Sequence, residues 1–357
     1  MTRTILIMAG GTGGHVFPGL AVANYLKSAG WHVVWLGTQA GMEARLVPQH
    51  DIDMKTIDFS GLRGKGAMTW LTLPLRLLRA FWQSIKVIRE VQPNVVLGMG
   101  GYPAFPGGMM ASLMSKSLLI HEQNSVPGLT NKVLAKLADK VLLGFPESIK
   151  NNNVTFSGNP VRDEISQLAR PEERYQNREG KLKLLVIGGS LGAQVLNTVV
   201  PETLKLLPQD RRPSVIHQAG AKHIEVLKQN YGDMVGDVEL VDFIEDMAAC
   251  YAGCDLVICR AGALTVSELA AGGVASILVP YPYAVDDHQT KNAEFLSVNN
   301  AAILLPQNEL TPKKLENILL ENTREDFLVL AKSARMLAKP DATQLVAQTC
   351  IDMSEEQ

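Results

Sequence analysis

The stretch Arg3-Thr-Ile-Leu-Ile-Met-Ala-Gly-Gly-Thr-Gly-Gly-His-Val-Phe-Pro18 decides the fold. Ile5 to Ala9 form a short apolar run that ends in glycines, which is typical of a buried parallel strand feeding a tight turn. Apolar residues then recur at helical spacing from Val16 to Leu26, so the glycines between Gly10 and Gly14 lie where a helix begins. The backbone N–H groups of such a turn and the helix dipole favour an anion. His15 stands at this predicted anion site, where an imidazole can transfer a proton as well as bind.

The bulk composition is that of an ordinary globular protein. With 357 residues, of which 46% are hydrophobic and 20% charged, the chain is long enough for two domains. A net charge of −2 argues against a nucleic-acid partner, because such binders are normally basic. The N-terminus lacks the apolar stretch of a signal peptide, and no run approaches the ~20 apolar residues of a membrane span. We therefore expect the chain to stay in the cytoplasm.

The four cysteines predict free thiols and no metal site. They include no C-x-x-C pair, and three of them fall in apolar surroundings near a predicted strand. The cysteines are Cys250, Cys254, Cys259 and Cys350.

Strand and helix signals alternate along the chain, which predicts an α/β fold with parallel sheets covered by helices. Leu182 to Gln194 repeats the pattern of strand, glycine turn and helix about half a chain after its first appearance. We therefore predict two Rossmann-like, doubly wound domains, residues 1–160 and 161–340, with a helix in 341–357 that returns to the first domain. Ligands of open parallel sheets bind at the carboxyl ends of the strands, so two facing sheets would define a cleft.

Two other segments of the first half are predicted to be irregular. Gly98 to Gly108 is rich in glycine and indicates a second loop that competes for an anion, and an Asn-rich segment runs loosely to Pro160.

A dinucleotide oxidoreductase is the first alternative, and its fingerprint fails twice. The pattern G-x-G-x-x-G would need glycine at Val16, and Gly37-Thr-Gln39 replaces the acidic ribose ligand after the second strand. The P-loop signature G-K-[ST] is also missing from the sequence. Either glycine turn, taken alone, could be a tight corner that binds no ligand, and this alternative stays open. The matching places of Thr12 and Ser190 in the two turns make it weaker.

Two stretches of the second half predict further ligand contacts. Cys259 to Gly273 indicates a strand end, a turn and a helix near Leu264, whose N–H groups can hold a phosphate or sugar. Glu268 on this helix can accept two hydrogen bonds from a ribose diol, or it can merely complement the helix dipole. Pro282 to Asn292 brings polar groups to a turn and helix start, which suits hydroxyl recognition or a solvated helix cap.

Six motifs, in order along the chain, resemble the MurG family of bacterial glycosyltransferases. They are Gly10-Gly-Thr-Gly-Gly-His15, Gly61-Leu-Arg-Gly-Lys-Gly66, His121-Glu-Gln-Asn124, Gly158-Asn-Pro-Val-Arg162, Gly188-Gly-Ser-Leu-Gly-Ala193 and Ala263-Leu-Thr-Val-Ser-Glu268. The resemblance implies the two-domain GT-B architecture and inverting transfer of N-acetylglucosamine from UDP-N-acetylglucosamine to the 4-hydroxyl of undecaprenyl-diphospho-muramoyl-pentapeptide. It also implies a role in peptidoglycan synthesis, hence in cell wall biogenesis, cell shape and division, with no cofactor and no tightly bound metal.

The resemblance further implies roles for individual residues. From the first domain, Thr12, Gly13, Gly14 and Asn124 would reach the donor. Arg162 and Ser190 would meet its diphosphate or uridine side, and the Ile244 backbone would meet uracil. The remaining donor contacts would come from Ala263, Leu264, Thr265, Val266, Ser267, Glu268 and Gln289. The loop after Tyr102 is bulkier and richer in proline than is usual in the family.

The chemistry of glycosyl transfer fits His15 independently. A sugar hydroxyl must lose a proton as it attacks the anomeric carbon, while the diphosphate leaving group gains negative charge. We hypothesise that His15 is the general base. The alternative is a structural or acceptor-positioning role.

The segment from Ser60 to Gln92 predicts contact with an anionic membrane surface. It contains six Lys or Arg residues and one acidic residue. Its predicted helix carries more apolar residues than one buried stripe needs, although burial of both faces remains the alternative. The predicted core-facing stripe is Leu71, Leu75, Leu78, Trp82, Ile85 and Ile88, with Trp70, Leu73, Leu77 and Phe81 on other faces.

The sequence therefore predicts a peripheral enzyme at the cytoplasmic face of the inner membrane. Its expected partners are UDP-N-acetylglucosamine, the undecaprenyl-linked acceptor and other proteins of cell-wall synthesis. A UDP-sugar epimerase on the same fold and a non-catalytic UDP-sugar sensor are the alternatives.

Overall fold

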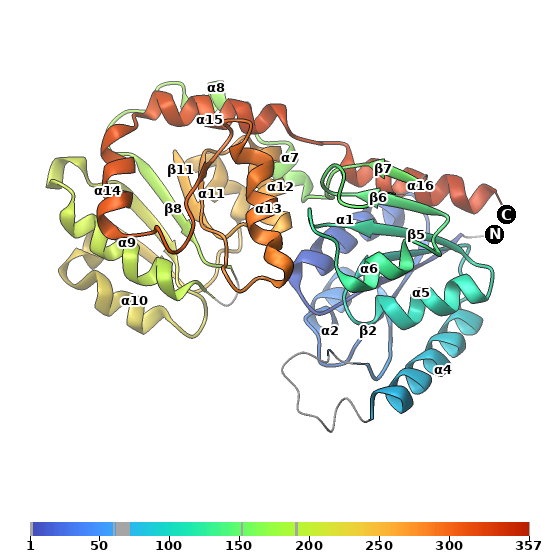
Figure 1. Ribbon diagram of the computed structural model, residues 1–357. Coiled ribbons are helices and arrows are strands. Elements are labelled where there is room, and N and C mark those ends of the chain that lie inside the picture. Colours follow the sequence, from blue (N-terminus) through green and yellow to red (C-terminus); the bar gives the residue numbers. More distant parts are fainter. Residues whose placement is uncertain (1–2, 60, 62–71, 151–152, 190–191, 357) are drawn as a thin grey trace. The chain divides into compact units, whose positions relative to one another are not determined.

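The chain forms two compact units, each built on one parallel sheet with helices on both faces (Figure 1). The first unit contains Met1–Arg162 and Pro340–Gln357, and the second contains Asp163–Lys339. The computed structural model describes residues 3–59, 61, 72–150, 153–189 and 192–356. The predicted α/β class with two doubly wound sheets is confirmed.

The elements of the first unit follow the predicted alternation of strands and helices. Its strands are β1 (Thr4–Ala9), β2 (His32–Gly37), β3 (Asp53–Thr56), β4 (Val95–Gly100), β5 (Ser117–Glu122), β6 (Lys140–Leu143) and β7 (Val154–Phe156). Its helices are α1 (Gly13–Ser28), α2 (Glu43–Leu46), α4 (Leu73–Val91), α5 (Ala104–Leu113), α6 (Leu129–Leu134) and α16 (Ala342–Glu355), with a short 3-10 helix, η1 (Val47–His50).

The second unit repeats the plan of the first. Its strands are β8 (Lys183–Ile187), β9 (Ser214–Gln218), β10 (Val238–Val241), β11 (Leu256–Cys259), β12 (Ser276–Leu278) and β13 (Ile303–Leu304). Its helices are α7 (Asp163–Ser166), α8 (Pro171–Tyr175), α9 (Gln194–Leu206), α10 (Ile224–Tyr231), α11 (Met247–Gly253), α12 (Ala263–Gly272), α13 (His288–Ser297), α14 (Pro312–Glu321) and α15 (Arg324–Met336), with 3-10 helices η2 (Gln209–Arg211), η3 (Gly232–Asp237) and η4 (Val285–Asp287).

The two sheets have the same strand order over their first six strands, so each is expected to bind a ligand at the equivalent position. The first sheet runs β3-β2-β1-β4-β5-β6-β7 and the second β10-β9-β8-β11-β12-β13. The order reverses between β1 and β4 in the first sheet and between β8 and β11 in the second. Open parallel sheets bind ligands beyond the carboxyl ends of the two strands at such a reversal. The candidate residues of the glycine turns follow β1 and β8, and those of the Cys259–Gly273 stretch follow β11.

Alternation along β1 builds two hydrophobic cores, one on each face of the first sheet. Ile5 and Ile7 pack on the face covered by α1 and α16, whereas Leu6 and Met8 pack on the face covered by α4, α5 and α6. Both faces of a parallel strand are buried in this arrangement, which is why β1 reads as a continuous apolar run. Both faces of the first sheet are therefore packed beneath its glycine turns.

The last helix belongs to the first unit. α16 packs on α1, and its buried residues Val346, Ala347 and Cys350 join the core on that face of the sheet. Thr343 Oγ1 donates a hydrogen bond to the carbonyl of Val161, 3.4 Å away.

Two predictions about irregular segments are wrong. Most of Gly98–Gly108 is regular, because β4 continues to Gly100 and α5 already begins at Ala104. Glycine there serves close packing: a Cβ at Gly107 would collide with Met8, and one at Gly108 would lie 2.8 Å from Leu134 Cδ1. The Asn-rich segment before Pro160 contains β7, which pairs with β6 and is too short to show a sequence period.

Candidate functional site

The first glycine turn is pressed against a second turn at the strand-order reversal. α1 begins at Gly13, and the N–H groups of His15 and Val16 bond to the carbonyl of its N-cap residue Thr12 at 3.1 and 3.2 Å. Gly101, which follows β4, has a φ of +81°, and a Cβ there would collide with the carbonyl oxygen of Gly10. Only glycine therefore allows the turns after β1 and β4 to approach each other this closely.

A buried carboxylate that the sequence reasoning missed holds the first turn in shape. Glu43 is fully buried and accepts hydrogen bonds from Gly11 N at 3.1 Å, Thr38 N at 3.0 Å and Thr38 Oγ1 at 2.7 Å. The N–H group of Gly11 is therefore already used in a hydrogen bond to the Glu43 carboxylate, which also places negative charge beside the turn. An anion would therefore meet the N–H groups at the start of α1 rather than the Gly10–Gly11 peptide.

His15 lies on the first turn of α1, and its ring contacts Gln123 and the Gly100 backbone. Its Nδ1 is 2.8 Å from Oε1 of Gln123, a residue that is 1% exposed. A Cβ at Gly100 would lie 3.0 Å from both Nδ1 and Cε1 of His15, so the ring packs directly against the Gly100 backbone. The imidazole thus has a fixed orientation at the carboxyl ends of β1 and β4.

The predicted motif His121 to Asn124 at the end of β5 is tied together by the buried Glu122. Its carboxylate accepts hydrogen bonds from Asn124 N at 2.8 Å, Gly128 N at 3.2 Å and Asn131 Nδ2 at 3.0 Å. His121 is fully buried, and burial lowers its pKa to about 4, so the imidazole is neutral near pH 7. The first unit therefore brings His15 and the loop that carries Asn124 to the same edge of its sheet.

In the second unit, the candidate helix α12 begins at Ala263, one residue earlier than predicted. Its N-cap is Gly262, and the Ser267 hydroxyl bonds back to the carbonyl of Ala263 at 2.9 Å. Glu268 is only 4% exposed and accepts a long hydrogen bond of 3.4 Å from the Tyr251 hydroxyl. Of the neighbouring candidates, Ala263 and Val266 are buried, whereas Leu264, Thr265 and Ser267 are partly exposed. A ligand at this helix start would meet backbone N–H groups first.

The other candidates of the second unit lie on separate elements. Ile244 is 8% exposed in the loop after β10. Gln289 lies at the start of α13, and its Oε1 accepts a hydrogen bond from Tyr281 N at 2.9 Å. Ser190 lies outside the described residues. Arg162, the last residue of the first unit's N-terminal part, is partly exposed.

Arg260, at the carboxyl end of β11, is a second residue that the sequence reasoning missed. Its Nη1 donates to the carbonyls of Val279 and Pro280 at 3.1 Å each, and its Nη2 donates to Gln307 Oε1 at 2.7 Å. The guanidinium also lies 5.4 Å from the centroid of the Tyr281 ring. Burial lowers the Arg260 pKa. The side chain fixes the loop that carries Tyr281, and its position within the Cys259–Gly273 stretch was the available signal.

The predicted core-facing stripe of α4 is right at Ile85 and Ile88 but wrong over the rest of its described residues. Leu75, Leu78 and Trp82 were expected in the core, but they are 71%, 64% and 65% exposed. The residues expected on other faces, Leu73, Leu77 and Phe81, pack against the core of the first unit together with Ile85 and the buried Ile88. Both faces are apolar, so helical periodicity alone could not select the buried one. The predicted Leu71, Trp70, Arg63 and Lys65 lie outside the described residues.

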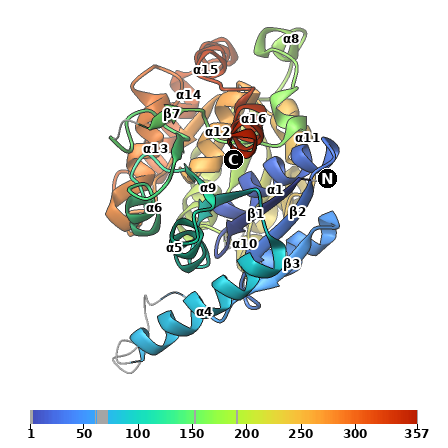
Figure 2. The same ribbon diagram turned by 90° about the vertical axis from the view of Figure 1, so that its right-hand side faces the viewer.

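The exposed side of α4 is apolar and flanked by cations. Figure 2 shows the helix at the periphery of the first unit, with its N-terminal half extending away from the sheet. Lys86 and Arg89 are exposed, and Arg79 pairs with Asp58. We define Leu75, Leu78 and Trp82 as the apolar surface of α4.

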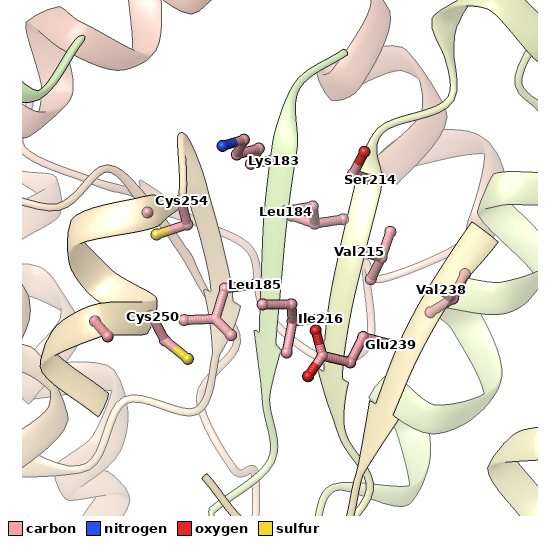
Figure 3. Close-up of a pocket in the computed structure, with 12 residues that line it drawn as sticks. Lys183, Leu184, Leu185, Ser214, Val215, Ile216, Val238, Glu239, Cys250 and Cys254 are labelled. Atoms are coloured by element: carbon pink, nitrogen blue, oxygen red, sulfur yellow. The ribbon is translucent and has the colours of Figure 1, made fainter. Parts of the chain in front are cut away.

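Figure 3 shows a groove of about 660 Å³ on the second sheet, and none of the candidate residues lines it. Lys183, Ser214 and Val238, which begin β8, β9 and β10, line it together with residues of α11. It is therefore at the amino ends of these strands, whereas α12 and the glycine turn follow carboxyl ends. We assign no ligand to this groove.

Neither a metal centre nor a membrane span emerges from the part of the chain that the structure describes. No three His, Cys, Asp or Glu residues there are placed to hold a metal ion, and no helix there is long and apolar enough to cross a bilayer. Cys254, Cys259 and Cys350 are buried free thiols, whereas Cys250 is only partly buried.

Comparisons with known proteins show the family of the chain. Residues 5–143 match the N-terminal domain of glycosyltransferase family 28, and residues 183–346 match the C-terminal domain of the same family. The UDP-N-acetylglucosamine–N-acetylmuramyl-(pentapeptide) pyrophosphoryl-undecaprenol N-acetylglucosamine transferase of Nitrosospira multiformis is 65% identical, with 99% of each chain covered. The transferase of the same name from Dechloromonas aromatica is 59% identical over 99% of this chain and all of the relative.

A solved structure is similar as well. The crystal structure of Acinetobacter baumannii MurG has a TM-score of 0.85 and 38% sequence identity, and it covers 98% of this chain and 99% of its own.

Proposed function

The chain belongs to glycosyltransferase family 28, and from this premise we propose that it transfers N-acetylglucosamine from UDP-N-acetylglucosamine to N-acetylmuramyl-(pentapeptide) pyrophosphoryl-undecaprenol. The observation that carries the proposal is the 65% identity to a transferase of this name, which spans 99% of both chains. The chain is a glycosyltransferase of peptidoglycan synthesis. The epimerase and the sensor are not favoured.

We infer that His15 is the general base of the transfer. The 4-hydroxyl oxygen of the muramoyl sugar forms a bond to the anomeric carbon of the donor while its proton moves to the imidazole. The bond between the anomeric carbon and the diphosphate oxygen breaks, and UDP leaves with the bonding electrons. Attack from the side opposite the leaving group inverts the anomeric centre. The fixed ring orientation against Gly100 and Gln123 supports this role, because a base must be positioned before its pKa matters.

The second unit is proposed to bind the donor. The N–H groups at the start of α12, from Ala263 to Val266, would face the UDP moiety, Glu268 would take the ribose hydroxyls and Gln289 the hydroxyls of the transferred sugar. Ile244 would meet uracil through its backbone, and Ser190 the diphosphate or uridine side. Arg162, at the end of the first unit's N-terminal part, would meet the same side of the donor. The helix dipole and backbone donors support this assignment, because they stabilise the charge that gathers on a diphosphate leaving group.

The first unit is proposed to contribute from the turn after β1. Thr12, Gly13 and Gly14 begin α1, and Asn124 is held by Glu122 on the neighbouring loop. These residues would contact the donor, while the same sheet edge receives the acceptor sugar beside His15.

We further propose that the apolar surface of α4 attaches the protein to the cytoplasmic face of the inner membrane. Leu75, Leu78 and Trp82 are exposed by 64–71% on one helix, with Lys86 and Arg89 nearby. Exposed apolar groups next to cations suit an anionic bilayer surface, which also carries the lipid-linked acceptor.

Transfer of radiolabel tests the proposed function. The purified protein is incubated with UDP-N-acetylglucosamine labelled in the sugar, with and without a short-chain lipid-diphosphate-linked muramoyl-pentapeptide acceptor. We expect label in the lipid product only when the acceptor is present. Conversion of the donor to a second UDP-sugar without acceptor would favour an epimerase, and binding without any conversion would favour a sensor.

A further inference from the structure

A chain of hydrogen bonds in the first unit runs from the backbone of Gly158 through His121 and Gln123 to His15. Its links are His121 Nε2 to Gly158 O at 3.0 Å, Gln123 Nε2 to His121 Nδ1 at 3.0 Å, and His15 Nδ1 to Gln123 Oε1 at 2.8 Å. The members come from the ends of β5 and β7 and the start of α1. The roles proposed above do not use His121, and they use Gln123 only as a contact of the His15 ring.

The first link fixes the tautomer of His121. A backbone carbonyl oxygen can only accept a hydrogen bond, so Nε2 of His121 must carry the proton that points to Gly158. His121 is fully buried, and burial lowers its pKa to about 4, so the ring holds one proton near pH 7. Its Nδ1 therefore carries a lone pair and acts as an acceptor.

The second link fixes the orientation of the Gln123 amide. Nε2 of Gln123 lies 3.0 Å from Nδ1 of His121 and also 3.0 Å from the His121 carbonyl oxygen. Both of these partners are acceptors, so the nitrogen of the amide must face them. The reversed amide would place its oxygen against two acceptors, Nδ1 and the carbonyl oxygen of His121, at a side chain that is only 1% exposed. Oε1 of Gln123 is therefore the atom that faces His15.

The third link then determines where His15 carries its proton. Because Gln123 Oε1 is an acceptor, Nδ1 of His15 must be the donor across the 2.8 Å contact. In the neutral ring the lone pair is left on Nε2. The Gly100 backbone, against which Nδ1 and Cε1 pack, keeps the ring in this plane.

We propose that Gln123 is a positioning residue for His15. The fixed tautomer of His121 orients the Gln123 amide, and the oriented amide fixes the tautomer of His15, so the two histidines carry their protons on opposite ring nitrogens. His121 holds its proton on Nε2, and His15 holds its proton on Nδ1. The inference deepens the proposed function and rests on it, because only a base needs its lone pair directed at the acceptor hydroxyl. An amide fixes the tautomer without placing negative charge beside the imidazole.

Nuclear magnetic resonance of the ring nitrogens tests the tautomers directly. The full-length protein is labelled with 15N-histidine, and long-range proton–nitrogen correlations near pH 7.5 distinguish the two neutral tautomers of each ring. The His15→Gln variant assigns the His15 signals by their disappearance. We expect His15 as the Nδ1–H form and His121 as the Nε2–H form; the signals of His121 are told from those of the other buried ring, His217, by their loss in His121→Gln. An Nε2–H form of His15 in the wild-type protein would overturn the proposal.

The Gln123→Met variant tests the consequence for turnover. Methionine keeps the length of the side chain but removes the amide, so the His15 ring is free to take both tautomers. We expect kcat to fall by about 10- to 100-fold, part of the ~10²–10⁴-fold that a positioned base supplies, while KM for the donor changes by less than about twofold. Gln348→Met, on the exposed side of α16, is the matched control with unchanged kcat.

The same spectra separate a positioning role from a general loss of structure. The hydrogen bond to the Gly158 carbonyl, and not Gln123, determines the tautomer of His121. His121 should therefore keep the Nε2–H form in Gln123→Met, while His15 becomes a mixture of its two tautomers. If kcat and the His15 tautomer both stay unchanged in Gln123→Met, the positioning role is refuted while the base proposal survives. If His15→Ala retains turnover, the base proposal itself fails, whatever the tautomers are.

Discussion

Replacing the apolar surface of α4 by polar residues should release the protein from membranes. The perturbation is the triple variant Leu75→Gln, Leu78→Gln, Trp82→Gln, which changes three side chains that are 71%, 64% and 65% exposed. These side chains make up the outer face of the helix, so their loss leaves the core of the first unit intact.

The expected magnitude follows from the exposed fractions. Removing a whole Leu or comparable side chain from water is worth about 1.5–3 kcal/mol, so side chains with two thirds of their surface exposed offer roughly 1–2 kcal/mol each. Three of them offer about 3–6 kcal/mol, and each ~1.4 kcal/mol is tenfold in a partition coefficient. We expect the triple variant to bind vesicles at least about 100-fold more weakly. Lys86 and Arg89 each add about 1 kcal/mol, but only on anionic vesicles.

The assay is flotation of the full-length protein with vesicles of neutral phosphatidylcholine and with vesicles that also contain anionic phosphatidylglycerol. Met336→Gln is the matched control, because Met336 is 79% exposed but lies on α15 of the second unit. Phe81→Ala, on the packed face of α4, should lower stability and leave the partition coefficient unchanged. Equal binding of the triple variant and the wild type would refute the reasoning, as would an equal loss in Met336→Gln.

The remaining predictions concern the first glycine turn and its surroundings. Gly101→Ala should destabilise the protein by several kcal/mol more than Gly30→Ala, because both glycines have positive φ but only the first Cβ collides with Gly10, and chemical denaturation measures the difference. Glu43→Gln should lower the free energy of unfolding by about 1–3 kcal/mol, since an amide nitrogen would face N–H donors where a carboxylate now accepts three hydrogen bonds; an unchanged urea midpoint would contradict this. Because the pKa of His121 is lowered to about 4, the unfolded state binds more protons between pH 6.5 and 4, so stability falls with decreasing pH there by up to ~3 kcal/mol from this residue. His121→Gln should therefore show a shallower loss of stability than the wild type over the same range, and parallel pH profiles would contradict the assignment.

The sequence predicted the fold because the strands of parallel sheets are continuous apolar runs with glycine turns at their ends. β1 and β8 show this pattern plainly, and the strand order places both turns at the reversal of the sheet. Family motifs supplied the candidate donor residues on α12, and their roles remain predictions.

The sequence could not supply features that depend on tertiary contacts. The apolar residues of α4 lie on two faces, and only the packing of Leu73, Leu77 and Phe81 shows which face is buried. Glycine in Gly98–Gly108 indicated a loop, although at Gly107 it permits a helix to approach the sheet. Partners far apart in the chain, such as His15 and Gln123, have no signal in local sequence at all.

Turnover of the His15→Ala variant tests the central claim most directly. The rate of label transfer to the lipid acceptor is measured at saturating donor, and the dissociation constant for UDP-N-acetylglucosamine is measured on the same preparation. We predict a fall in kcat of about 10²–10⁴-fold with donor affinity within about twofold of the wild type. Near-normal kcat in His15→Ala would contradict the account.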